Sequence, residues 1–123
     1  MKWREHSVLV VQDNETERRA IMHFLKIEGF EVYGAENAIK ALNFLEMPID
    51  LVLSNPNFGD ETGLDLLKAW KQEKPDVPYI VFAAGKSTKA AVEALKAGAY
   101  DYIIKPVDLD ELVLVIRRAL NEN

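Results

Sequence analysis

The sequence predicts an α/β fold, with one doubly wound, five-stranded parallel sheet covered by helices on both faces. Three observations lead to this prediction. Short apolar runs alternate along the chain with stretches whose apolar residues lie three or four apart. Within two of the runs, Val8 to Val11 and Leu51 to Leu53 are apolar throughout, which is typical of buried parallel strands. The length of 123 residues suits five strand-helix units, whereas a closed eight-stranded barrel needs about twice that length.

The apolar runs give the expected strands in chain order. They are Ser7 to Val11, Glu31 to Ala35, Asp50 to Ser54, Pro78 to Ala83 and Tyr100 to Ile104. Crossovers between parallel strands are right-handed, and a short chain favours an open sheet. We therefore expect the flavodoxin-like (βα)5 strand order 2-1-3-4-5. No repeat, linker or low-complexity tract divides the chain, so residues 1-123 are expected to form one domain.

The stretches between these runs have the spacing of helices, as at Ile21, Phe24 and Leu25. Residues that end helices follow four of the stretches. They are Gly29, Pro48, Pro75 and Gly98. Asp108 with Glu111 three residues later resembles a capping box that opens the last helix.

Composition excludes several classes of function. Fifteen Lys and Arg against twenty Asp and Glu give a net charge of −5, so no general basic field exists to bind nucleic acid. The absence of cysteine removes disulfides and thiolate chemistry. The longest early apolar run, Val8 to Val11, is far shorter than a signal peptide core or a membrane span. We expect a cytoplasmic protein that does not bind a membrane.

In an open parallel sheet, ligands bind beyond the carboxyl ends of the strands where the strand order reverses, here between the first and third strands. The residues that follow the strands are therefore the candidate site. They are Gln12 and Asp13, then Asn55, then Ala83 at the end of its run, then Lys105 with Pro106. This set is polar but contains few groups that can perform chemistry.

The chain resembles the receiver domains of bacterial response regulators, the CheY-like superfamily. The resemblance covers essentially the whole chain. It is carried by Val8 to Val11, Asp50 to Ser54, Gly63-Leu64, Gly98 to Pro106 and Asp110 to Leu112 in family order and spacing. The segment from Tyr100 to Leu112 is most similar to receivers fused to NtrC-type enhancer-binding transcription regulators.

The resemblance implies a phosphoryl-accepting pocket, and this sequence departs from it. The family uses an aspartate after the third strand as nucleophile, an acidic pair for Mg²⁺, a hydroxyl and a lysine. Asn55 takes the nucleophile position, Gln12 replaces one acid beside Asp13, and Ala83 replaces the hydroxyl, while Lys105 is kept. We therefore expect a pseudo-receiver that is not an enzyme, has no cofactor, and binds Mg²⁺ very weakly or not at all.

The resemblance also implies a cis peptide bond between Lys105 and Pro106. We expect Lys105 to pair with Asp13 or with the side-chain oxygen of Asn55. Tyr102 occupies the position of the aromatic residue that turns inward in receivers, and we expect it to stay packed because Ala83 offers no hydroxyl.

Without phosphorylation the domain acts through its partners, which the resemblance implies to be a histidine kinase or the chain's own output domain. A homodimer is expected through the face of the helix after Gly85, the strand ending at Ile104 and the last helix. The charged residues expected on this face are Lys89, Glu93, Lys96, Asp101, Arg117 and Arg118.

Two other interpretations remain open. The first is an active phosphoacceptor that uses an unorthodox residue, such as Asp60 or Glu61 in the loop after Asn55. The second is a flavodoxin-like module that binds a nucleotide or cofactor. The first turn, from Gln12 to Glu15, argues against the second because it is acidic and contains no glycine.

Overall fold

The computed structural model describes residues 6–58, 61–83 and 88–121. Its main sheet contains β1 (Ser7–Val11), β2 (Glu31–Ala35), β3 (Leu51–Ser54), β6 (Tyr79–Ala83) and β7 (Asp101–Ile104). These strands are parallel and lie in the order β2-β1-β3-β6-β7. The predicted doubly wound sheet and its strand order are confirmed.

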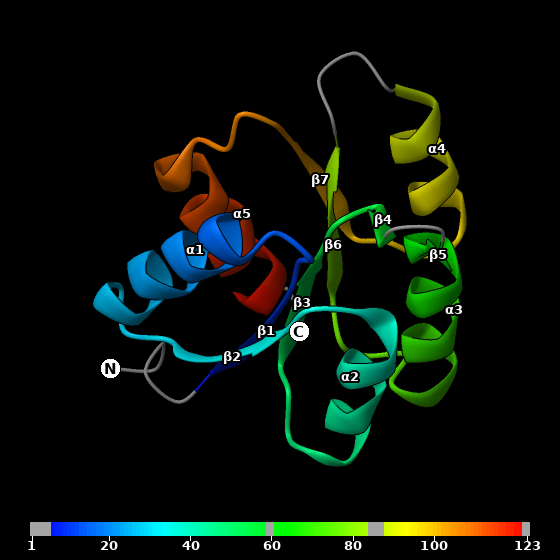
Figure 1. The fold of residues 1–123 in the computed structure, drawn as a ribbon, viewed down its shortest axis with the longest axis horizontal. Coiled ribbons are helices and arrows are strands. Elements are labelled where there is room, and N and C mark those ends of the chain that lie inside the picture. Colours follow the sequence, from blue (N-terminus) through cyan, green and yellow to red (C-terminus); the bar gives the residue numbers. More distant parts are fainter. Residues whose placement is uncertain (1–5, 59–60, 84–87, 122–123) are drawn as a thin grey trace.

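The helices cover both faces of the sheet (Figure 1). They are α1 (Glu15–Ile27), α2 (Ala38–Leu42), α3 (Gly63–Glu73), α4 (Thr88–Lys96) and α5 (Leu109–Asn121), and a 3-10 helix, η2 (Asn43–Glu46), continues α2. No helix of the described residues is long and apolar enough to cross a membrane.

Alternation along the strands divides the core into two layers. Val8 and Val10 of β1 pack with α1 and α5, where Leu25 and Ile116 are fully buried. Leu9 and Val11 point to the other face and pack with α2, α3 and α4, in one cluster with Trp70 and Ala94. Successive strand residues point to opposite faces. The residue that follows Val11 therefore points toward the α1 and α5 layer.

The helix signals predicted at Gly29 and Asp108 are present, and the structure adds a cap at Asn14. The side chain of Asn14 accepts a hydrogen bond from the Glu17 amide at 2.9 Å and caps α1. Asp108 accepts hydrogen bonds from the amides of Asp110 and Glu111 at 3.0 and 3.2 Å, which caps α5. Gly29 after α1 has a φ of 104°, where a side chain would be strained.

A second, two-stranded antiparallel sheet was not predicted. It consists of β4 (Asn57–Phe58) and β5 (Glu61–Thr62), with Asn57 paired to Thr62. Two residues per strand are too few to produce a period in the sequence. The small sheet lies between the end of β3 and α3, directly after the candidate site.

Candidate functional site

Gln12 and Asn55 lie side by side at the carboxyl edge of the sheet. Val11 of β1 is in register with Ser54 of β3, and the Asn55 amide donates to the Val11 carbonyl at 3.0 Å. The next residue of each chain segment therefore points to the same face of the sheet. Gln12 is 0% and Asn55 is 7% exposed. The structure thus places two buried neutral amides at the point where the strand order reverses.

The Asn55 side chain is a hydrogen-bond donor to Asp13. Its Nδ2 lies 3.1 Å from Asp13 Oδ1. A carboxylate can only accept hydrogen bonds, so the nitrogen of the amide must face Asp13. The other end of the amide, Asn55 Oδ1, is buried and has no hydrogen-bond partner within the described residues. Asn55 therefore carries no charge that could offset the Asp13 carboxylate, and it contacts Asp13 by donating a hydrogen bond from its side-chain N–H.

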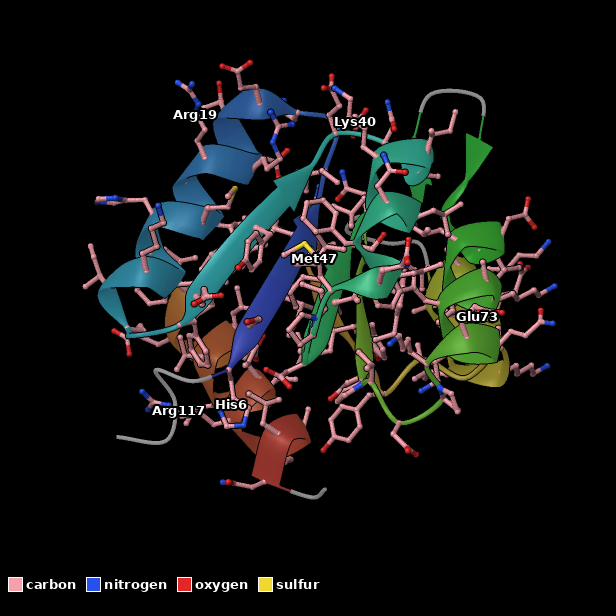
Figure 2. All side chains as sticks on the ribbon, turned by 90° about the horizontal axis from the view of Figure 1, so that it is seen from below. His6, Arg19, Lys40, Met47, Glu73 and Arg117 are labelled. Carbon is pink, nitrogen blue, oxygen red and sulfur yellow. The ribbon has the colours of Figure 1, made fainter. Side chains whose placement is uncertain are left out.

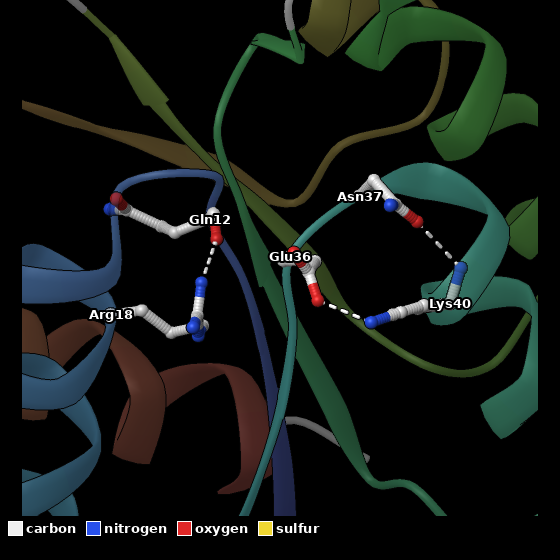
Figure 3. Close-up of polar contacts among 5 residues, drawn as sticks. All are labelled: Gln12, Arg18, Glu36, Asn37 and Lys40. Carbon is white, nitrogen blue, oxygen red and sulfur yellow. Dashed lines mark hydrogen bonds and ion pairs between the residues drawn. The ribbon is translucent and has the colours of Figure 1, made fainter.

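Gln12 is held by its main chain and not by its side chain. Its amide donates to the Ala35 carbonyl at 3.0 Å, and its carbonyl accepts from Arg18 Nη1 at 2.8 Å (Figure 3). Both polar atoms of its side chain are buried without a partner. A buried, unpaired amide group costs stability. Gln12 is therefore a polar side chain in a space that an apolar side chain could fill.

Lys105 does not pair as the sequence predicted. The expected partners were Asp13 and the Asn55 oxygen, but Lys105 Nζ lies 3.2 Å from Glu17 Oε1. The ammonium also lies 5.9 Å from the centre of the Phe82 ring. Asp13 already accepts the Asn55 hydrogen bond, and Glu17 in the first turn of α1 offers a second carboxylate. The Lys105–Pro106 peptide bond is cis, as the resemblance implied.

Sequence reasoning missed Glu17 and Phe82 as neighbours of Lys105. The signal for Glu17 was its place in the first turn of α1, three residues after the capping Asn14. The signal for Phe82 was strand alternation, because Phe82 and Ile103 share the core layer of α1 and α5. Phe82 and Ile103 both point to the α1 and α5 face of the sheet, and Lys105, two residues after Ile103, points to the same face.

Ala83 and Tyr102 occupy the remaining predicted positions. Ala83 is 3% exposed, and its carbonyl accepts a hydrogen bond from the Lys105 amide at 2.8 Å. Its side chain can neither donate nor accept a hydrogen bond. Tyr102 is half-buried beside a groove between β7 and α5, and its amide donates to Asp101 Oδ1 at 2.8 Å. That Tyr102 stays packed remains a prediction.

The predicted interaction face is only partly assembled as expected. Lys89, Lys96 and Arg118 are exposed and Asp101 is half-buried. Glu93 is also exposed, but it lines a cleft between α4 and α3, so we remove it from this face. Arg117 instead lies 3.3 Å from Glu28 at the end of α1. Figure 2 shows it at the end of the molecule where His6 leads into β1, away from the site. Since Arg117 is on the side of α5 that contacts α1, we remove it from this face.

Exposed apolar side chains on the same face were missed by sequence reasoning. Val92 and Leu95 of α4 are 46% and 39% exposed. Ile104 of β7 and Leu114 of α5 are 48% and 61% exposed and line one groove. The sequence did contain a signal for them. Each of these apolar residues lies outside the periodic set of apolar positions that forms the buried face of its helix or strand.

Comparison with known proteins identifies the family. The model of the response regulator receiver domain matches residues 8–117, and the chain belongs to this family. It is 38% identical to the regulatory protein AtoC of Escherichia coli over 92% of the chain and 25% of that protein. It is 36% identical to the transcriptional regulator NtrC of Azospirillum brasilense over 95% of the chain and 24% of that protein.

Solved structures agree with this placement. The receiver domain of NtrX from Brucella abortus superposes with a TM-score of 0.89 at 33% identity, covering 94% of this chain and 99% of that one. A receiver domain protein from Clostridium thermocellum superposes with a TM-score of 0.90 at 30% identity, covering 95% of both chains. The chain spans about a quarter of the length of the curated relatives it matches.

Replacing Gln12 tests the cost of its unpaired amide. We expect Gln12→Met to raise the free energy of unfolding by about 1 kcal/mol, because a thioether of similar size needs no hydrogen bond. Denaturant unfolding at neutral pH measures the change. A loss of more than about 1 kcal/mol would show that the amide has a partner such as a buried water.

Restoring a carboxylate at the end of β3 tests the hydrogen bond to Asp13. Asn55→Asp places a second carboxylate about 3 Å from Asp13 and removes the donor, so we expect a loss of about 1–3 kcal/mol at neutral pH. Added Mg²⁺ should recover part of this loss, with weak affinity. Denaturant unfolding with and without Mg²⁺ measures both.

Asn37→Asp is the matched control for this substitution. Asn37 caps α2 by accepting a hydrogen bond from the Lys40 amide, so a carboxylate there faces helix amides. We expect little change in stability and no response to Mg²⁺. Equal losses in the two variants would contradict the role given to Asn55.

Proposed function

We propose that this chain is a pseudo-receiver, a non-enzymatic regulatory module that acts by protein contact and not by accepting a phosphoryl group. The observation that carries the proposal is the Asn55 amide, which donates to Asp13 at the position where the family has its nucleophile. An amide nitrogen that donates a hydrogen bond, with its oxygen buried, offers no charged oxygen for in-line attack on phosphorus.

The side chains around Asn55 also fit Mg²⁺ poorly. A complete receiver pocket has three carboxylates and one ammonium, whereas here Asp13 is the carboxylate that remains and Lys105 pairs with Glu17. Mg²⁺ keeps its waters and needs carboxylates or phosphates to hold it. Among the described residues, no cluster of three or more acidic or histidine side chains could hold a metal. We propose that the site does not bind Mg²⁺ at ordinary concentrations.

The partners we propose are a histidine kinase or an output domain of the same protein, in a cytoplasmic transcription regulator. The support is the relationship to AtoC and NtrC, which are named as regulatory and transcriptional regulatory proteins. The net charge of −5 supports regulation through protein and not through direct contact of this domain with nucleic acid.

Incubation with acetyl phosphate and Mg²⁺, followed by intact mass measurement, tests the proposed loss of phosphoryl acceptance. We expect no phosphoryl adduct on the native chain. The control is the triple variant Gln12→Asp, Asn55→Asp, Ala83→Thr, which regains the groups the family uses and should form an adduct under the same conditions.

A stable adduct on the native chain would overturn the proposal and favour the unorthodox phosphoacceptor. Asp60 and the side chain of Glu61, the residues considered for that role, lie outside the part of the chain that the structure describes. A purified protein that absorbs or fluoresces at visible wavelengths, where tryptophan does not, would instead favour the flavodoxin-like cofactor module.

We further propose that the chain forms a homodimer through α4, β7 and α5. The four exposed apolar residues supply an apolar centre, and Lys96, Asp101 and Arg118 supply a rim of mixed charge. Interfaces between subunits have this arrangement, and the same patch can meet itself across a two-fold axis.

Placing a charge in the apolar centre tests the dimer. Leu114→Lys should weaken dimerisation by about tenfold or more, because an ammonium in the centre of the interface must be desolvated. Ile27→Lys is the matched control, since Ile27 is 68% exposed on α1 outside this face. Sedimentation equilibrium measures both variants. A native chain that is monomeric at high micromolar concentration, or equal effects of the two variants, would contradict the proposal.

A further inference from the structure

A cleft lies between α3 and α4, on the face of the sheet that is opposite α1 and α5. Leu64 and Leu67 of α3 line one side, Ala90 and Ala94 of α4 line the other, and Val81 of β6 forms the floor. Its volume is about 200 Å³. Protein interiors leave few voids larger than a water molecule, and an apolar cavity of about 150 Å³ is large enough to bind benzene. The cleft can therefore hold a small organic molecule.

Small residues keep the cleft open. Ala90 and Ala94 are one helical turn apart, so neither fills the space between the helices. Gly63, at the start of α3, donates its amide to the Pro56 carbonyl at 2.6 Å. A Cβ on Gly63 would lie 2.5 Å from the same oxygen, so no larger residue fits there without moving the backbone. The cleft is thus bounded at this end by a tightly folded main chain.

Among the described residues, Glu93 is the charged side chain that lines the otherwise largely apolar cleft. It is exposed, and within the described part of the chain its carboxylate has no ion-pair or hydrogen-bond partner. Lys89 and Lys96 lie about one helical turn away on α4 and are exposed to solvent. The cleft therefore combines a largely apolar lining with one unpaired carboxylate at its edge.

We infer that the cleft binds a small organic cation, a primary amine with an apolar body of roughly benzene size. The apolar part displaces water from the leucine and alanine side chains, and the ammonium lies beside the Glu93 carboxylate. The same carboxylate weakly disfavours an anion of similar size. The cleft is lined by Pro56, which follows Asn55, but by neither Asn55 nor Asp13, so the inference does not require that the chain accept a phosphoryl group.

Binding of benzylamine, with benzyl alcohol as its neutral counterpart, tests the inference by amide NMR titration of the native chain. We expect benzylamine to shift the amides of Leu67, Ala90 and Ala94 with a Kd of about 1 mM, the affinity open to so few atoms. Benzyl alcohol should bind about two- to fivefold more weakly, because an ion pair with an exposed carboxylate contributes little. Absence of shifts at the cleft would overturn the inference.

Two variants with matched controls sharpen the test. Glu93→Gln should remove the preference for the amine over the alcohol, whereas Glu73→Gln, at the exposed last residue of α3 (Figure 2), should keep it. Ala90→Leu fills the cleft and should weaken binding of both molecules by about tenfold or more. Ala20→Leu, on an exposed position of α1, should leave binding unchanged. A preference that survives Glu93→Gln would overturn the role of the carboxylate, whatever the alanine variants do.

Discussion

The hydrogen bond from the Asn55 amide to the Asp13 carboxylate is the contact on which the arrangement of the site depends. It satisfies Asp13 without a cation, and it requires a neutral donor at the end of β3. Lys105 does not pair with Asp13, and its ammonium lies 3.2 Å from the Glu17 carboxylate on α1. The two charged side chains at this edge therefore take different partners, Asp13 the Asn55 amide and Lys105 the Glu17 carboxylate.

This arrangement replaces a cluster of like charges with neutral groups. Carboxylates that lie close together repel one another unless a cation binds between them. Without the cation, the pKa of at least one of them rises. Gln12, Asn55 and Ala83 are buried and carry no charge, so the carboxyl edge of the sheet can remain packed without a metal ion. The remaining cost lies in the buried atoms that have no hydrogen-bond partner among the described residues, which are both polar side-chain atoms of Gln12 and Asn55 Oδ1.

Helix α4 presents two different surfaces on its two sides. Ala90, Glu93 and Ala94 face the cleft with α3, whereas Val92 and Leu95 are exposed toward the face proposed for the dimer. Residues on a helix advance by about 100° each, which separates these two sets. The proposed amine site and the proposed dimer face therefore use different sides of the same helix.

The sequence by itself determined the strands, their order, the cap at Asp108, and the set of residues at the carboxyl edge. These features depend on the spacing of apolar residues and on residues that are close together along the chain. They can therefore be predicted from one sequence. The tertiary structure decided which partners the side chains take. Glu17 with Lys105 and Arg117 with Glu28 join residues far apart in the sequence. Such pairs depend on distances of a few ångströms across packed helices, and no local pattern records those distances.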